Sequence, residues 1–106
     1  MTRTERIQIL KNQQIEDPLD SFTAYALTLE LAAEFPEEAT VYWKTQLRNF
    51  PQYLPTYLLA GQSFLDAGDS ETAIAIWKEG LLLAEANPDQ HASSELKAAI
   101  MNALVD

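Results

Sequence analysis

Residues 57–77, YLLAGQSFLDAGDSETAIAIW, decide the fold of this chain. Two runs with the apolar spacing of a helix, 57–67 and 71–77, are separated by Gly68-Asp69-Ser70, which is typical of a turn. Gly61 lies inside the first run, where glycine costs a helix about 0.5–1 kcal/mol relative to alanine. Some packing interaction must therefore offset this cost.

The rest of the chain repeats this alternation of helical runs and breakers. Apolar residues recur with helical spacing nearly everywhere, and no stretch shows the sustained alternation of a strand. The breakers cut the chain into six segments of roughly 11–17 residues, and they fall at Asp17-Pro18, Phe35-Pro36, Phe50-Pro51 with Pro55, Gly68-Asp69-Ser70, and Asn87-Pro88. We therefore predict an all-α chain of about six helices.

Residues at these breakers predict how the helices begin. Ser70 is expected to cap a helix that starts at Glu71. The stretch Asn87-Pro88-Asp89-Gln90 offers a cap, a proline in the first turn and a capping-box glutamine. Glu37 and Glu38 follow Pro36 and place two anions where a helix dipole favours them.

Composition excludes several classes of protein. With 106 residues and 47% apolar residues, the chain predicts one folded domain with a modest core. Its formal charge of −9 disfavours binding to nucleic acids and to anionic membranes. The carboxylates keep a helical surface in solution or, alternatively, attract a basic partner. The absence of cysteine, together with an N-terminus unlike a secretory signal, favours the cytoplasm.

A repeat of about 34 residues links the two tryptophans. Trp43 and Trp77 are 34 residues apart, and so are Ala39 and Ala73. A helix–turn–helix unit of this period is the signature of tetratricopeptide repeats, which the chain resembles. The second unit carries the family pattern at Tyr57, Ala60, Gly61, Phe64, Ala73, Trp77 and Gly80. The first matches more loosely, at Ala24, Leu27, Thr28, Leu31, Ala39, Trp43 and Pro51, with Thr28 in place of a smaller residue.

This resemblance implies an α-solenoid of antiparallel helices and gives Gly61 a role. In the family, a small residue on the first helix lets the second helix cross closely, so Gly61 is expected to pack on Ala73. Gly80 is expected to let the next helix approach. The single domain then comprises a helix (1–17), two repeats (18–51 and 52–87) and a capping helix (88–106). Apolar stripes at Ile7, Leu10 and Ile15, and at Leu96, Ile100 and Leu104, are expected to pack the terminal helices onto the stack.

No residues suggest catalysis, a cofactor or a metal. His91 is the single histidine, and a zinc site would need further nitrogen or sulfur ligands. The acidic pairs Glu16-Asp17 and Glu37-Glu38 lie at helix ends, where capping explains them better than acid–base chemistry does. We therefore expect a protein that is not an enzyme and that binds no cofactor.

The resemblance directs attention to the first helix of each repeat. Family members bind peptides or protein surfaces in a concave groove lined by these helices, and one subset clamps a terminal carboxylate with lysine and asparagine. At the matching positions this chain has no basic residue, and Asp66 would repel a carboxylate. The matching residues are Tyr25, Ala26, Leu29, Ala33, Leu58, Leu59, Gln62 and Asp66.

A second apolar stripe on these helices gives the candidate binding residues. They are Phe22, Tyr25, Leu29, Leu58 and Leu65, with Gln62 as a polar group that orients the ligand. A helix that is apolar on more than one face is usually covered, either by the terminal helices or by a partner. We predict a noncatalytic interaction module for a protein or peptide, with a basic or amphipathic segment as its preferred ligand. The alternative is a homo-oligomeric scaffold, such as a homodimer, that uses the same patch.

Overall fold

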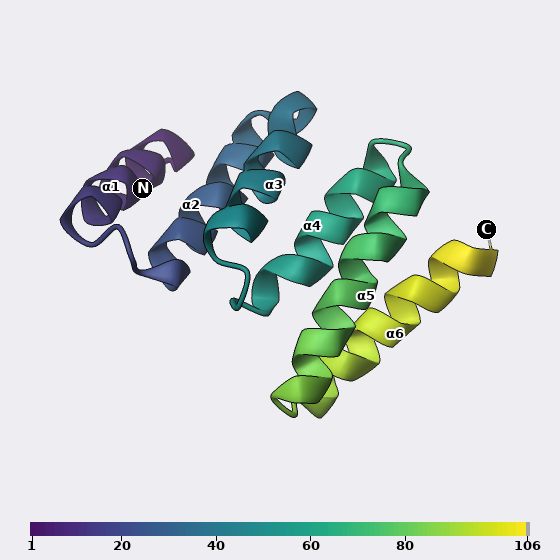
Figure 1. Ribbon diagram of the computed structural model, residues 1–106. Helices are drawn as coiled ribbons and strands as arrows, with labels where there is room; N and C mark the ends of the chain where they lie inside the picture. The colour runs from purple at the N-terminus through teal and green to yellow at the C-terminus, as the bar shows by residue number, and fades with distance from the viewer. Residues whose placement is uncertain (106) are drawn as a thin grey trace. The chain divides into compact units, whose positions relative to one another are not determined.

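The computed structural model describes residues 1–105, which form six α-helices and one short 3₁₀ helix (Figure 1). No strand occurs in this part of the chain, so the all-α prediction is confirmed. The helices are α1 (Arg3–Glu16), α2 (Ser21–Glu34), η1 (Pro36–Glu38), α3 (Ala39–Asn49), α4 (Pro55–Asp66), α5 (Ser70–Ala86) and α6 (Gln90–Val105).

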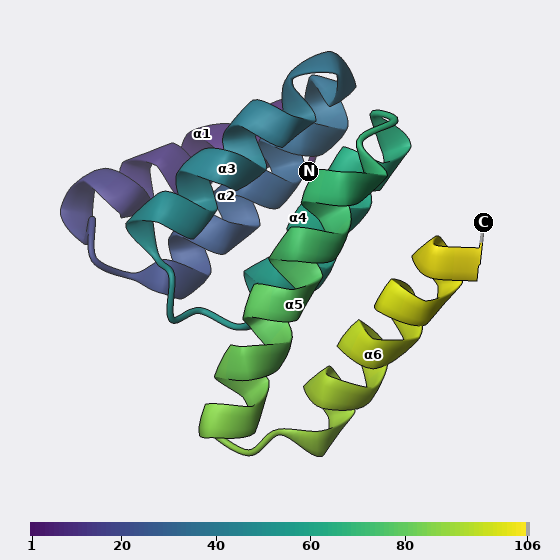
Figure 2. The same ribbon diagram turned by 45° about the vertical axis from the view of Figure 1, so that its right-hand side comes forward.

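The helices gather into two compact units. The first unit spans Met1–Phe50, and the second begins at Pro51. In the first unit α2 packs against both α1 and α3, and in the second α5 packs against both α4 and α6 (Figure 2). The division between the units falls one residue from the predicted boundary between the two repeats, 51/52. Each predicted repeat therefore supplies a helical hairpin to one unit, joined there by a terminal helix.

Gly68 and Asp69 form the turn between α4 and α5. Gly68 has a φ of +87°, a left-handed conformation that glycine adopts without strain. Its N–H donates to the Leu65 carbonyl, and the Asp69 N–H donates to the Phe64 carbonyl, which is the Schellman pattern at a helix end. This pattern fixes Asp69 as the residue from which the next helix starts.

Aspartates, not the predicted residues, cap α5 and α6. The Asp69 carboxylate accepts the Thr72 N–H at 3.1 Å, so the prediction that Ser70 is the cap was wrong by one residue. The Asp89 carboxylate accepts the Ala92 N–H at 3.0 Å, and Asn87 instead ends α5. A carboxylate is a stronger acceptor than a hydroxyl and also interacts favourably with the helix dipole.

Two glycines let α4 and α5 pack in close contact. A Cβ atom on Gly61 would collide with the indole ring of Trp77, and a Cβ on Gly80 would lie 2.6 Å from the Cβ of Tyr57. The indole N–H of Trp77 donates to the backbone carbonyl of Leu58 at 3.1 Å. Gly61 therefore faces Trp77, and Gly80 makes room for α4, whereas we had expected contacts with Ala73 and with the next helix.

A polar pair takes the place of these glycines in the first unit. Thr28 and Gln46 occupy the repeat positions of Gly61 and Gly80, and both are buried. The Thr28 hydroxyl lies 2.8 Å from the Ala24 carbonyl and 3.4 Å from the Gln46 amide oxygen. The Gln46 amide nitrogen has no hydrogen-bond partner, although the side chain is 3% exposed. This crossing is thus filled by polar atoms that are not fully satisfied.

The terminal helices use part of their predicted stripes. Leu96 and Ile100 of α6 are buried, and Ile7 and Leu10 of α1 are half-buried. The other two expected members, Ile15 and Leu104, are exposed, so their assignment to the packed stripes was wrong. Both lie in the last turn of their helix, where the apolar spacing continues beyond the residues that are covered.

Candidate interaction surface

The surface of α2 carries an exposed apolar stripe. Phe22 is 64% exposed and Leu29 is 43% exposed, and the two are seven residues apart on one face of the helix. Tyr25 is half-buried, and its ring packs on Trp43 with a centroid distance of 5.8 Å and an interplanar angle of 56°. Phe22 and Leu29 therefore form the accessible part of this face, and Tyr25 joins it to the core of the first unit.

The start of α2 is fixed by Asp20. Its carboxylate accepts the backbone N–H of Phe22 at 3.1 Å and the hydroxyl of Thr23 at 2.6 Å. The hydrogen bond from the Thr23 hydroxyl is the main cause that lowers the pKa of Asp20. Desolvation opposes this shift, and the backbone N–H groups of Phe22 and Thr23 contribute smaller effects that also lower the pKa. A cap at this position determines where the first exposed residue of the stripe, Phe22, lies on the helix.

The matching surface of α4 lies in the second unit. Leu58 and Leu65 are half-buried, and Gln62 between them is exposed. The Gln62 amide donates to the Asp66 carboxylate at 2.9 Å, one turn along the helix. The face of α4 thus presents two leucines beside an oriented amide and one carboxylate. The six candidate residues therefore lie as two separate sets of three, one set on each unit.

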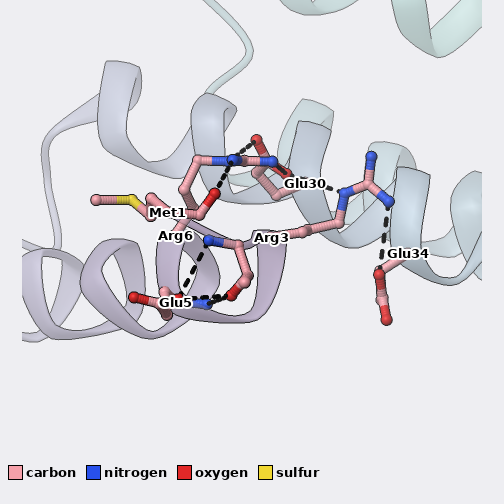
Figure 3. A network of polar contacts seen from close by, with 7 residues as sticks. Met1, Arg3, Glu5, Arg6, Glu30 and Glu34 are labelled. Carbon is pink, nitrogen blue, oxygen red and sulfur yellow. Dashed lines mark hydrogen bonds and ion pairs between the residues drawn. The ribbon is translucent and has the colours of Figure 1, made fainter.

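An ion-pair cluster between α1 and α2 was not predicted from the sequence (Figure 3). Glu30 accepts hydrogen bonds from Arg6 Nε at 3.0 Å and from Arg3 Nε at 3.2 Å, and Arg3 also lies 3.6 Å from Glu34. The hydrogen bond from Arg6 is the main cause that holds the pKa of Glu30 below its ordinary value, although desolvation opposes it. Glu30 is a single charged residue inside the apolar run of α2. This feature of the sequence could have indicated that Glu30 forms an ion pair with another helix.

The start of α1 also escaped prediction. Thr2 and Glu5 form a capping box, in which the Thr2 hydroxyl accepts the Glu5 N–H and the Glu5 carboxylate accepts the Thr2 N–H. The spacing Thr-x-x-Glu announces this motif in the sequence. The capping box sets the register of the helix that carries Arg3 and Arg6.

The remaining polar residues form no further site within residues 1–105. No group of three or more potential metal-ligating side chains lies together in this range. His91 and Glu95 form an exposed pair one turn apart in α6, with 2.6 Å between Nε2 and Oε1. None of the described helices is both long and apolar enough to cross a membrane.

Comparison with solved structures decides the family. The sequence matches no family model and no curated protein. A solution NMR structure of a tetratricopeptide repeat domain protein from Salinibacter ruber is 30% identical and aligns with a TM-score of 0.72. The alignment covers 82% of this chain and 89% of that one. This chain belongs to the tetratricopeptide-repeat family.

A crystal structure supports the same assignment for this tetratricopeptide-repeat protein. It describes a tetratricopeptide repeat domain protein from the same organism, with 28% identity and a TM-score of 0.71. The alignment covers 79% of this chain and 94% of the chain in the crystal structure. The six helices thus form a tetratricopeptide-repeat fold. With the repeat boundaries predicted from the sequence, α2 and α4 would be the first helices of the two repeats.

Proposed function

We propose that this tetratricopeptide-repeat protein is a noncatalytic interaction module that binds apolar segments of a partner protein through the exposed face of α2 and through the face of α4. The exposed stripe of Phe22 and Leu29 carries this proposal. Both side chains lie on a helix that packs against α1 and α3 through other residues, among them the buried Ala24 and Leu27. Exposed apolar groups beside a helical core gain free energy when a partner covers them.

Charge indicates the chemistry of the partner. The chain carries a net charge of −9, and the candidate face of α4 contributes a carboxylate, Asp66, without a cation at the matching positions. A basic or amphipathic segment suits such a face, because apolar burial supplies affinity and charge steers the encounter. Acidic partners, nucleic acids and anionic membranes are disfavoured on the same ground. We also propose that the protein acts in the cytoplasm.

Single-lysine variants on each unit test this proposal. Leu29→Lys and Leu58→Lys place a charge on the two candidate faces, and the backbone carbonyl of Leu58 remains free to accept the Trp77 indole. Val41→Lys adds the same charge at an exposed apolar residue of α3 and serves as the matched control. The immobilised chains are exposed to extract of the native host, and retained proteins are identified by mass spectrometry. We expect proteins that the parent and Val41→Lys retain and that the other two variants lose.

Each variant must keep its helicity and melting temperature for that comparison to count. If Leu29→Lys and Leu58→Lys fold normally and retain the same proteins as the parent, these faces do not bind the partner. If either variant unfolds, the leucine belongs to the core, and a milder change such as Leu29→Ser or Leu58→Ser replaces it.

A homo-oligomeric scaffold is the alternative that the same stripe supports. Exposed Phe22 and Leu29 would then be covered by a second copy of the chain. Light scattering of the purified parent distinguishes the two functions, because a dimer that Leu29→Lys converts to a monomer would favour self-association. A parent that is monomeric at all concentrations would favour a different protein as the partner.

A further inference from the structure

Half-buried side chains and a cluster of ion pairs together hold α1 on α2. None of its residues is buried, and its contact with α2 consists of a stripe of half-buried side chains at Arg6, Ile7, Leu10 and Gln14, extended by Arg3. Both arginines pair with Glu30, and Arg3 also reaches Glu34 (Figure 3). Exposed ion pairs of this kind hold two surfaces together weakly and are weakened further by salt.

The helical state of α1 depends on that contact. A helix of 14 residues is marginal in water by itself, even with a good cap. If α1 leaves α2, it loses both the ion pairs and the support for its backbone hydrogen bonds. Release and unfolding of α1 are therefore one event, which amide exchange can detect.

The surface of α2 that α1 covers, here called the seat, includes Glu30 and Glu34 and has a specific chemistry. Glu30 and Glu34 lie one turn apart, and the Glu30 side chain is 20% exposed when α1 is in place. By helical spacing, Leu27 and Thr23 continue this face toward the start of α2. If α1 is absent, this face of α2 presents two carboxylates followed by Leu27 and Thr23, which complements a helix that carries cations followed by apolar side chains.

We propose that α1 is a tethered ligand, and that its seat on α2 accepts in trans a helix with two arginines three residues apart, followed by apolar residues. Arg3, Arg6, Ile7 and Leu10 provide the template for that arrangement. The inference rests on the proposed function as an interaction module, but it concerns a different face of α2 from the one that carries Phe22 and Leu29. Its partner must displace α1, so binding and release of α1 are coupled.

A synthetic peptide of residues 1–17 is the probe. It is labelled with a fluorophore and added to the full-length parent and to three full-length variants. Arg3→Gln with Arg6→Gln weakens the attachment of α1 and leaves the residues of the seat unchanged. The addition of Glu30→Gln then removes the carboxylate that both arginines contact. Lys11→Gln with Lys44→Gln removes two positive charges at exposed residues outside the cluster and is the matched control. Amide exchange of residues 3–16 is measured on the same proteins.

We expect peptide binding and amide exchange to change only when residues of the Arg3, Arg6 and Glu30 cluster are replaced. The peptide should bind the Arg3→Gln/Arg6→Gln variant at least about tenfold more tightly than the parent or the lysine control, because the seat is free for a larger fraction of the time. Glu30→Gln in that variant should abolish binding. Amide exchange over residues 3–16 should rise by about tenfold in the arginine variant, and exchange in α5 should stay unchanged.

Equal peptide binding to the parent and the arginine variant, or binding that persists with Glu30→Gln, would overturn the proposal. If the arginine variant disturbs α2 and α3 as well, exchange in the parent at about 1 M salt, where charges are screened beyond about 3 Å, decides instead. Unchanged protection of α1 there would also overturn it. The peptide assay uses no native partner. It can therefore fail while the extract experiment with Leu29→Lys succeeds, and the reverse, so the two proposals are tested separately.

Discussion

The indole N–H of Trp77 on α5 donates a hydrogen bond to the backbone carbonyl of Leu58 on α4, 3.1 Å away. Gly61 makes this possible, because any side chain at that position would occupy the space of the indole ring. The interaction anchors the backbone of α4 at the residue whose side chain belongs to the candidate surface. Packing inside the repeat thus determines how Leu58 is presented.

Gly61→Ala is expected to destabilise the protein. Alanine favours the helix by up to about 1 kcal/mol, whereas overpacking against Trp77 costs about 1–3 kcal/mol, so the net effect is a loss of stability. Urea unfolding of the parent, Gly61→Ala, Trp77→Leu and the double variant measures it. In the Trp77→Leu background the alanine should cost less, because the indole is gone. A Gly61→Ala protein more stable than the parent would show that the glycine is not there for packing.

Replacement of Gln46 by methionine is expected to stabilise the first unit. The Gln46 amide nitrogen is buried without a hydrogen-bond partner, and such a group costs about 1–3 kcal/mol. Methionine keeps the length of the side chain and removes the amide, so unfolding free energy should rise by about 1 kcal/mol. Gln13→Met, at an exposed residue of α1, is the control and should change stability by less than about 0.5 kcal/mol. A loss of stability in Gln46→Met would mean that the amide does find a partner.

Two leucines of α6 should differ sharply in importance. Leu96 is 2% exposed and Leu104 is 64% exposed. Leu96→Ala removes a buried side chain and should cost about 2–5 kcal/mol. Leu104→Ala should stay within about 0.5 kcal/mol of the parent. Thermal unfolding followed by circular dichroism compares the two, and equal effects would contradict the assignment of α6 as a helix packed through Leu96.

The Tyr57 hydroxyl should make stability fall at alkaline pH. It donates to the Pro51 carbonyl at 2.6 Å, and burial, followed by the nearby charge of Glu79, raises the pKa of Tyr57 above its ordinary value of 10.0. The folded state therefore favours the protonated form. This contribution is fully present below pH 10.0 and is lost as the pH rises through the raised pKa.

Tyr57→Phe isolates this effect. At neutral pH the variant should be less stable by about 0.5–1.5 kcal/mol, the usual net value of one hydrogen bond. The difference in unfolding free energy between parent and variant should shrink as the pH rises above 10.0. A difference that stays constant to high pH would show that ionisation of Tyr57 is not linked to folding.

Acid should weaken the attachment of α1. The hydrogen bond from Arg6 lowers the pKa of Glu30 from its ordinary value of 4.5, so the folded state favours the ionised carboxylate. The resulting stabilisation is complete above pH 4.5 and is lost as the pH falls through the lowered pKa. A carbon-13 NMR titration should place the Glu30 midpoint below 4.5 and should show it rise in Arg6→Gln. Arg48→Gln, which removes a charge from α3, should leave the midpoint unchanged.

Spacing within one repeat predicted much of the core but few of the polar contacts. The 34-residue spacing of Trp43 and Trp77 and the family pattern predicted that Gly61 lies at the crossing of the two helices of a repeat, but they named Ala73 as its neighbour, whereas the structure places Trp77 there. The burial of Gln46 was not predicted, because helical periodicity treats a polar residue as exposed. Arg6 and Glu30 are 24 residues apart on different helices, and no local rule joins them.

The candidate surface shows the same division. The sequence predicted the second apolar stripe, and Phe22 and Leu29 are indeed exposed. It did not predict that Tyr25 packs on Trp43, since the choice between a rotamer on the core and one toward the solvent depends on the neighbouring helix. Asp69 was overlooked as a cap because the Schellman turn at Gly68, which selects it, is a backbone feature.

The two repeats place the large and the small residue of the helix crossing on opposite helices. A helix of one repeat is therefore a poor substitute for the matching helix of the other. Tyr57 meets Gly80 in the second repeat, whereas Ala24 and Gln46 hold the same positions in the first. A recombinant gene that joined α2 to α5 would set alanine against glycine and leave a void. One that joined α4 to α3 would force tyrosine and glutamine into one space. The two helices of each hairpin are therefore matched to each other, and we expect a chimera that exchanges one helix between the hairpins to be less stable than the parent.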